Sequence, residues 1–489
     1  MTAASTPHAE PAMDVDEFRD AAHQLVDWMA DYMDTIESRP VRAPTLPGAV
    51  LEQIPEAAPE SGEPFARLFD DFQRIILPAM THWQHPSFFA YFPANTSPPS
   101  ILAEMLTATL AAQCMSWQTS PAATELEQTM MDWLRQMIGL PAGFEGVIQD
   151  SASSATLCAL LTARERATGD RVNERGFVGE TALAVYGSTE CHSSIEKDVT
   201  IAGIGRRQLR KIAVDENYAM VPAALEAAIE ADRAAGLVPA CVVAAIGTTG
   251  SSAIDPLAAI ADICRRHGVW LHVDAAWAGS ALILPDYRWM IDGIEHADSF
   301  VFNPHKWLLT NFDCSAYFVR DPDALLRTLS ILPDYLKTRE GQRVHDYRDW
   351  GVPLGRRFRA LKLWFVIRSY GVRGLQDLIR GHIAMAERLA GEIAAADDFE
   401  VLAPVPLALI CFRYRPKGLD EEDRIDRLNE ALVERINDSG TAYLTHTRLA
   451  GRYAIRFSIG QTTTAQHHVD AAWRRVRATA RGLIEAPAS

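Results

Sequence analysis

The chain has little lysine and a deficit of positive charge. Only six of its 489 residues are lysine, and 47 lysine and arginine residues stand against 63 aspartate and glutamate residues, which gives a net charge of −16 at pH 7. Phosphate backbones and anionic membrane surfaces attract basic proteins, so the charge balance argues against nucleic acid or a membrane surface as a partner. The length and the 48% hydrophobic content are enough for more than one buried core.

The sequence also lacks paired cysteines and a leader. Its seven cysteines are scattered with no C-x-x-C pair, as is typical of reduced thiols inside the cell. The first residues contain neither the basic nor the apolar stretch of a secretory signal. The longest uncharged segment, 105–124, includes Gln113, Gln118 and Pro121 and is too polar for a membrane span. We therefore expect a cytoplasmic protein.

Periodicity divides the chain into three parts. Asp14 and Glu17 form a capping-box pattern before an amphipathic run, and six prolines between positions 40 and 64 then interrupt regular structure. From about 150 to 320, apolar runs alternate with helical segments, which predicts βα units on a mainly parallel sheet. The expected strands there are 183–186, 240–247, 269–273 and 299–302, and the expected helices are 221–235 and 256–267. Strand-like runs at 407–414 and 453–459 predict a smaller α+β domain.

One crossover helix has clear end signals. Asp255 is expected as its N-cap, Pro256 as its first residue and Gly268 as the residue that ends it. Ligands of open α/β sheets bind beyond the carboxyl ends of the strands, so the polar residues that follow the expected strands are the first candidates for a site.

Lys306 lies in unusual surroundings for a lysine. No other formally charged residue occurs between Asp298 and Asp313, and the neighbours are mostly apolar or aromatic. Desolvation would lower the pKa of this lysine and make a neutral, nucleophilic amine available; the alternative is a lysine that reaches the surface or pairs with a buried acid. The other five lysines have the charged or turn-like neighbours of a solvated surface.

Asp274 ends an apolar run where a sheet ligand would lie. With His272 it supplies only two metal ligands, and nothing nearby completes a set, so we expect no metal. A carboxylate at this place can instead hold a heteroaromatic nitrogen protonated, because the attraction at ~3 Å and an effective dielectric constant of ~20 is roughly 5 kcal/mol before desolvation.

Residues 150–156, DSASSAT, precede an apolar helix and predict a phosphate seat at its N-terminus, although similar runs also cap ordinary helices. His192 is a lone histidine that could stack on an aromatic ring. A desolvated lysine, a strand-end acid, a phosphate seat and such a histidine are together what pyridoxal 5′-phosphate (PLP) requires.

Several stretches of the sequence match the motifs of a known enzyme family. HPSFFAYFP (85–93), SWQTSPAATELE (116–127), HVDAAWAG (272–279), NPHKW (303–307) and PLGRRFRALKLWF (353–365) closely resemble the aromatic-L-amino-acid decarboxylase family of group II PLP-dependent decarboxylases. The resemblance implies an α/β protein of fold type I, the aspartate-aminotransferase type. It implies an N-terminal helical segment and dimer arm (1–97), a large PLP-binding domain (98–361) and a small C-terminal domain (362–489), in a homodimer whose active site is shared between subunits.

The resemblance also assigns roles. Lys306 would bind the cofactor covalently, Asp274 would pair with the pyridine nitrogen, His192 would stack on the ring, and Tyr335, in a loop at 332–337, would donate a proton. The other implied cofactor contacts are Ala152, Ser153, Asn303, Thr249, Ala276 and His272. The implied substrate pocket consists of Tyr91, Phe92, Pro93, Ala94, Met115, Trp117, His305, Phe312 and Gly355.

The implied reaction is decarboxylation of an aromatic L-amino acid, of the tryptophan, DOPA, tyrosine or phenylalanine type, to the arylalkylamine and CO₂. Related aldehyde synthases, the main alternative, typically have Phe in place of Tyr335 or Asn in place of His192. Gly355 favours a large aromatic substrate, whereas Ala94 and Met115 depart from the family's usual residues and soften the pocket. A glutamate-type decarboxylase would need cationic residues for a second carboxylate, and a catalytically silent scaffold would be expected to lose Lys306, Asp274 or His192.

Overall fold

The larger part of the molecule is built on a seven-stranded sheet. The computed structural model describes residues 13–331 and 344–485. The strand order is β1-β7-β6-β5-β4-β2-β3. The strands are β1 (Glu145–Gln149), β2 (Leu183–Ser188), β3 (Leu209–Ile212), β4 (Val238–Ala245), β5 (Trp270–Asp274), β6 (Ser299–Phe302) and β7 (Ser315–Val319). The pairs from β6 to β3 are parallel, and only β7 runs antiparallel to its neighbours β6 and β1. The predicted α/β class and mainly parallel sheet are confirmed.

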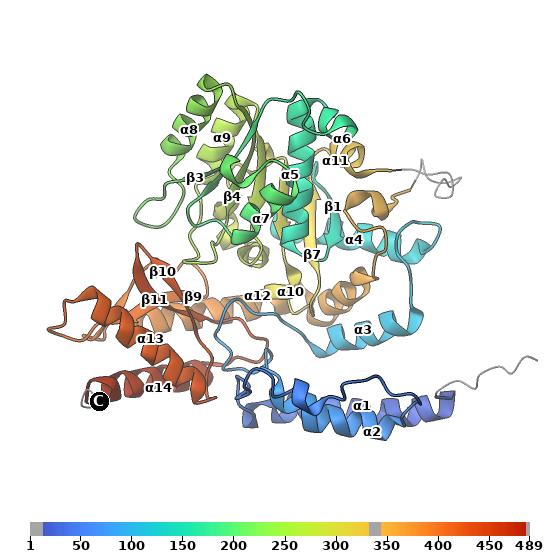
Figure 1. Cartoon of the computed structure of the whole chain (residues 1–489), viewed down its shortest axis with the longest axis vertical. Coiled ribbons are helices and arrows are strands. Elements are labelled where there is room, and N and C mark those ends of the chain that lie inside the picture. Colours follow the sequence, from blue (N-terminus) through green and yellow to red (C-terminus); the bar gives the residue numbers. More distant parts are fainter. Residues whose placement is uncertain (1–12, 332–343, 486–489) are drawn as a thin grey trace, which may run out of the picture.

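Helices cover both faces of this sheet (Figure 1). Alternate residues of β2 separate the faces: Leu183 and Val185 pack in one cluster, and Ala184 and Tyr186 pack in another, as the period of two in a strand requires. The first face packs against α5 (Ala152–Thr168) and α7 (Ser193–Ile201), and the second against α4 (Pro121–Ile138), α8 (Pro222–Ala234) and α9 (Leu257–His267). Shorter helices are α6 (Arg171–Arg175), α10 (Pro304–Trp307) and α11 (Pro322–Leu329).

The ends of α9 confirm one expectation and correct another. Gly268 follows the helix with φ +63°, in the left-handed conformation expected of a C-terminal glycine. The N-cap, however, is Pro256, and the expectation that Asp255 caps the helix is wrong. The buried Asp255 carboxylate instead accepts hydrogen bonds from the backbone N–H groups of Ala245 (2.8 Å), at the end of β4, and Met220 (2.7 Å), shortly before α8.

The smaller part contains an antiparallel four-stranded sheet of order β10-β11-β9-β8. Its strands are β8 (Phe399–Val401), β9 (Leu409–Tyr414), β10 (Thr445–Leu449) and β11 (Arg452–Ser458), and its helices are α13 (Glu422–Asp438) and α14 (Gln466–Glu485). The long helix α12 (Arg359–Ala394) connects the two parts and is interrupted at Gly371 (φ +64°). The predicted strands at 407–414 and 453–459 are confirmed, and the predicted boundary at 361/362 falls in the first turn of α12.

The N-terminal helices lie along one side of the body. Helix α1 (Val15–Thr35) begins with the predicted capping box, in which Asp14 accepts from the N–H groups of Asp16 and Glu17. It runs beside α2 (Phe65–Asp71), below α3 (Pro98–Leu110) in Figure 1, and Trp28 contacts Phe69 and Phe72. No residue of α1 is buried. Within the described part of the chain, no helix is both long and apolar enough to cross a membrane.

Candidate active site

A cavity of about 740 Å³, counting its open mouth, lies beyond the carboxyl ends of β4, β5 and β6. This is the place where open α/β sheets bind ligands. Its wall includes residues from the ends of these strands and from the N-termini of α5, α7 and α10. The residues that line it are Phe92, Ser151, Ala152, Ser153, His192, Ser194, Ala245, Gly247, Thr248, Thr249, Asp274, Ala276, Trp277, Asn303, His305, Lys306 and Phe312.

Lys306 enters the cavity from the short helix α10. Asn303 is the N-cap residue of that helix, and the amide of Asn95 donates to the Lys306 carbonyl (2.8 Å), which fixes the backbone. Among the described residues, no hydrogen bond or ion pair holds the Lys306 amine. Burial lowers the pKa of Lys306, and the Arg456 charge lowers it further, although Asp274 opposes both. Lys306 therefore lines the cavity with an amine whose pKa is lowered.

Asp274 is the last residue of β5, and backbone hydrogen bonds hold the residues after it beside the segment that leads to Lys306. Ala275 donates to Val301 (2.9 Å) and Asn303 to Ala276 (2.8 Å), so the ends of β5 and β6 are held in register. The Ala276 N–H also donates to Asp274 Oδ1 (3.0 Å), which orients the carboxylate. The acid at the end of β5 and the amine on α10, which follows β6, thus line one cavity.

His192 precedes α7 and caps it. Its Nδ1 accepts from the Ser194 backbone N–H (3.2 Å) and faces the Ser194 hydroxyl (2.8 Å). Because Nδ1 accepts from a backbone donor, the ring proton lies on Nε2. Burial lowers the pKa of His192, and Lys306 lowers it further, while Asp274 raises it. A neutral ring, suited to stacking, faces the cavity.

The N-terminus of α5, where the sequence predicts a phosphate seat, opens onto the cavity. Ser151 is the N-cap residue, and its hydroxyl accepts from Ser154 N–H (3.2 Å). The N–H groups of Ala152 and Ser153 lie in the first turn, where no intrahelical acceptor exists, and both residues line the cavity. Opposite them, Asn303 accepts from the Ser315 hydroxyl (2.6 Å), which fixes its amide.

Two further cofactor-side residues, Thr249 and Ala276, line the cavity, but His272 does not. The His272 ring is completely buried between Thr156 (3.1 Å) and Ser299 (2.9 Å), beneath the cavity floor. Burial lowers its pKa to about 4. His272 is therefore placed to support the floor of the cavity and does not touch a molecule bound in it.

Only three of the nine expected substrate-pocket residues line the cavity of this chain: Phe92, His305 and Phe312. Burial and the Lys306 charge lower the pKa of His305 to about 3, and its Nδ1 accepts from Cys314 N–H (2.9 Å). Tyr91 lines a neighbouring cavity instead. Pro93, Ala94, Met115, Trp117 and Gly355 line neither of these two cavities, and Tyr335 lies outside the described residues.

Sequence reasoning missed Arg456, on β11. It is 3% exposed, and two of its nitrogens, Nε and Nη2, have no hydrogen-bond partner among the described residues; Nη1 donates to Thr445 (3.0 Å). It lines the neighbouring cavity, which shares His192 and Thr249 with the first. An arginine inside the apolar run 453–459 was the available signal, because unpaired buried arginines are rare.

The expectation that Lys362 lies on a solvated surface is wrong. Its side chain is 1% exposed and pairs with Glu104 of α3 at 2.8 Å. The acid that neutralises it lies more than 250 positions earlier in the chain, so local sequence gave no sign of it.

The residues present fit PLP. The amine of Lys306 is unengaged, Asp274 is oriented toward the same space, and the free N–H groups of Ala152 and Ser153 offer a phosphate seat. Behind the cavity, Gly279 packs directly against β6, since a Cβ at this position would approach Phe302 Cβ to 2.3 Å. The strand ends can therefore pack as they do only with glycine at 279.

Comparisons with known proteins show the family of the chain. The model of the pyridoxal-dependent decarboxylase conserved domain matches residues 47–415. The chain is 42% identical to tyrosine decarboxylase 4 of Petroselinum crispum (97% of this chain, 95% of the relative) and 44% identical to phenylacetaldehyde synthase of Arabidopsis thaliana (96% and 97%). The crystal structure of Oryza sativa TDC with PLP and tryptamine superposes with a TM-score of 0.94 at 38% identity, covering 97% of this chain and all of that one.

Proposed function

Because the chain belongs to the family of pyridoxal-dependent decarboxylases, we propose that it is a PLP-dependent carboxy-lyase that converts aromatic L-amino acids into arylalkylamines and CO₂. The observation that carries the proposal is the available Lys306 amine in one cavity with Asp274 and His192. The relatives include a tyrosine decarboxylase and a tryptophan decarboxylase, so the substrate class is aromatic, and tryptophan, DOPA, tyrosine and phenylalanine are the candidates.

Each cavity residue has a physical task. When bound, PLP supplies an electron-poor pyridinium ring that accepts the electron pair left as the bond to the carboxylate breaks. Asp274 holds the proton on the ring nitrogen, because a carboxylate stabilises the adjacent positive charge. The neutral His192 ring would pack against the cofactor ring and exclude water, and the N-terminus of α5 would hold the phosphate. Lys306 would hold the cofactor through its amine, and the same amine could carry a proton beside the substrate.

Arg456 is suited to receive the substrate carboxylate. It presents two unpartnered N–H groups near Lys306 and is held against the Phe92 ring. A charge-assisted bond to a carboxylate would satisfy donors that are otherwise buried at a cost. Holding the carboxylate fixes the orientation of the bond that must break, and this lowers the entropic part of the activation barrier.

The second candidate is an aldehyde synthase, which the similarity to phenylacetaldehyde synthase favours. The presence of both Tyr335 and His192 favours amine formation. The deciding experiment is mass-spectrometric product analysis of the purified, PLP-loaded protein in air with separate L-tryptophan, L-DOPA, L-tyrosine, L-phenylalanine, L-histidine and L-glutamate. Amines from aromatic substrates would support the proposal, and aldehyde with peroxide, or turnover of glutamate alone, would refute it. Tyr335→Phe should divert product toward aldehyde.

We propose a homodimer that covers the N-terminal side of the molecule. Apolar side chains are exposed there on α1, α3 and nearby loops, and such a concentration is typical of an interface. Phe312, at the mouth of the cavity, is itself 66% exposed. The exposed apolar residues are Val15, Phe18, Leu46, Leu51, Leu68, Leu102, Leu106, Leu110, Val352 and Leu354.

In this proposal Met115, Trp117 and Gly355 complete the partner's cavity rather than their own. Subunit complementation tests it: a Lys306→Ala chain and a Gly355→Trp chain, each inactive alone, are unfolded, mixed and refolded together. If the site is shared, one site of the mixed dimer pairs a native Lys306 with a native Gly355, and activity returns. If each chain holds a complete site, the mixture stays inactive.

A cytoplasmic location also belongs to the proposal. All seven cysteines are buried and unpaired, which fits a reducing compartment. Fractionation of the source cells would test it.

A further inference from the structure

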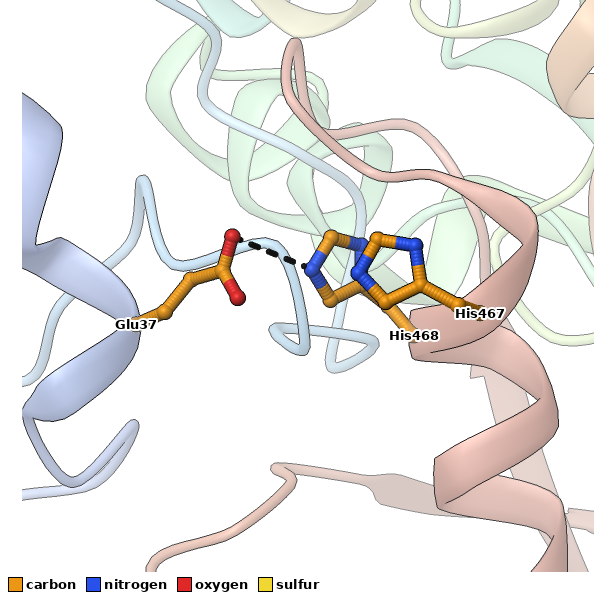
Figure 2. A group of neighbouring side chains, drawn as sticks. All are labelled: Glu37, His467 and His468. Atoms are coloured by element: carbon orange, nitrogen blue, oxygen red, sulfur yellow. Dashed lines mark ion pairs between the residues drawn. The ribbon is translucent and has the colours of Figure 1, made fainter.

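Three side chains far from the active-site cavity meet between the two ends of the chain. Glu37 lies in a short 3₁₀ helix, Ile36–Ser38, that follows α1, and His467 and His468 lie in the first turn of α14. One potential ligand atom from each lies within 4.8 Å of the other two. Figure 2 shows the Glu37 carboxylate and both imidazole rings facing the same space.

His468 is the buried member of this cluster. Its side chain is 8% exposed, and its Nε2 has no hydrogen-bond partner among the described residues, although it lies 3.3 Å from Glu37 Oε1. Its Nδ1 accepts from the Ala465 N–H at the start of α14 (3.0 Å), and this bond aims Nε2 at Glu37. The ring is therefore held in place with one nitrogen directed at the carboxylate and unsatisfied.

Glu37 and His467 are also held in place by neighbouring residues. The His85 side chain is hydrogen-bonded to the Glu37 backbone, and its own Nδ1 accepts from Ser87 N–H (2.9 Å). The His467 ring centre lies 3.8 Å from that of His468, so both imidazoles are on the side of α14 that faces Glu37. Within the described residues, no arginine or lysine forms an ion pair with Glu37.

We propose that Glu37, His467 and His468 bind a divalent transition-metal ion of borderline softness, with Zn²⁺ as the reference case. Two imidazole nitrogens and a carboxylate oxygen are ligands that Zn²⁺ takes in proteins, with water as a fourth. Ligand atoms about 2.0–2.1 Å from a tetrahedral ion lie roughly 3.3 Å apart. The 3.3 Å separation between His468 and Glu37 already has this value, and the His467 ligand atom lies within 4.8 Å of both. Ca²⁺ and Mg²⁺ are excluded as main occupants because they require oxygen ligands.

Metal binding would break one hydrogen bond of the protein, and this loss weakens the affinity for the ion. A metal on Nε2 moves the ring proton of His468 to Nδ1, which then loses the hydrogen bond from Ala465. Because that loss is of the size of one hydrogen bond, and only three protein ligands are present, we expect a micromolar rather than nanomolar dissociation constant.

A second cluster serves as a comparison. Glu226, Glu230 and His267 also satisfy the distance condition, but Arg266 forms an ion pair with Glu226. A cation there would have to displace a guanidinium, and none of the three residues is buried. The cluster around His468 therefore has a buried ligand and, within the part of the chain that the structure describes, no competing cation, whereas the cluster around His267 is a surface group that already pairs with an arginine.

The bound ion would join segments about 430 positions apart, linking the α1 region to the C-terminal helix. A ligand that binds only the folded chain stabilises it in proportion to the logarithm of its concentration over the dissociation constant. At 100 times that constant, we expect the melting temperature to rise by about 2–4 °C.

The test uses the full-length holoenzyme, first freed of metal by dialysis against a chelator. Titration with Co²⁺, followed by its visible d–d absorption above 500 nm, should show one saturable site per chain that Zn²⁺ displaces. Scanning calorimetry with Zn²⁺ should show the upward shift, and EDTA should reverse it. Glu37→Gln and His467→Ala should each lower affinity at least tenfold, while His267→Ala, in the comparison cluster, should leave it unchanged.

Both exposed ligands can be replaced without disturbing the core, so loss of folding does not confuse the result. Absence of saturable Co²⁺ binding below about 100 µM would overturn the proposal and leave His468 and Glu37 as an ion pair only. Binding that survives both Glu37→Gln and His467→Ala, or that disappears in His267→Ala, would also overturn it. Because the readouts are absorption and melting temperature, the outcome does not depend on the decarboxylase activity.

Discussion

The Arg456 guanidinium lies 5.2 Å from the centre of the Phe92 ring. The Lys306 amine lies 5.5 Å from the same ring centre, and Trp277 stacks on Phe92 at 4.3 Å. Phe92 thus places a cation that never loses its charge near an amine that must lose its proton to react. Because the Arg456 charge lowers the pKa of Lys306, this arrangement both activates the amine and offers a site for an anionic group.

Replacing Arg456 should impair substrate binding without unfolding the protein. We expect Arg456→Met to lower kcat/KM by about 100-fold, since loss of a buried charge partner costs roughly 3 kcal/mol. The melting temperature should not fall, because two buried N–H groups of Arg456 are unsatisfied without a ligand. Steady-state kinetics and calorimetry check this, with the exposed Arg427→Met as control. An unchanged kcat/KM would show that Arg456 does not meet the substrate.

The buried ion pair between Lys362 and Glu104 should stabilise the packing of α12 on α3. In Lys362→Met the partly buried Glu104 keeps, among the described residues, only the exposed Arg357 as an ion-pair partner, so we expect a loss of about 3 kcal/mol in unfolding free energy. Denaturant titration measures it. The matched control is Lys417→Met, whose pair with Asp397 is equally short but exposed and should matter by less than about 1 kcal/mol. Equal effects of both variants would contradict the prediction.

Asp255 should be needed as an acceptor rather than as a helix cap. In Asp255→Asn only one side-chain oxygen remains for the two N–H donors of Ala245 and Met220, so one buried donor loses its partner at a cost of about 1–3 kcal/mol. Chemical unfolding tests this against Asp262→Asn, an exposed carboxylate of α9, the helix that follows Asp255. If Asp255→Asn is as stable as the parent, the two backbone bonds do not contribute.

Asp198 should make stability depend on pH. Burial raises the pKa of Asp198 to about 7, and Asp274 adds to the rise, while one of its oxygens has no partner among the described residues. Because the folded-state pKa lies above that of the unfolded chain, the stabilising contribution of the protonated form is complete below about pH 4 and is lost as the pH rises through about 7.

Asp198→Asn removes that loss. We expect the variant to exceed the parent in stability at pH 8 by up to about 4 kcal/mol, and by much less at pH 5. Melting temperatures of both proteins from pH 5 to pH 9 give the comparison. A difference that is independent of pH would show that Asp198 does not titrate in this range.

Much of the local structure was predictable because its causes are local. The Asp14 capping box, the Gly268 helix end and the alternation of strands and helices depend on residues within a few positions of one another. The apolar neighbours of Lys306 predicted its lowered pKa for the same reason, since the segment that carries the lysine also buries it.

The errors and omissions have the opposite cause. The sequence around Asp255 predicts a helix cap, but in the folded chain its carboxylate binds the N–H groups of Ala245 and Met220. The sequence around Lys362 predicts a solvated side chain, but in the folded chain it pairs with Glu104 of α3. Arg456 reaches the neighbourhood of Lys306 from a strand 150 positions away, and His468 meets Glu37 from the other end of the chain.

The sequence by itself therefore determined which chemical groups the protein has and the secondary structure that carries them. The tertiary structure decided which of these groups meet: Lys306 with Asp274 and Arg456, and Glu37 with two histidines. The physical reason is that helix ends and desolvation by neighbouring residues act over a few positions of the chain, whereas hydrogen bonds and charge interactions act over a few ångströms in space.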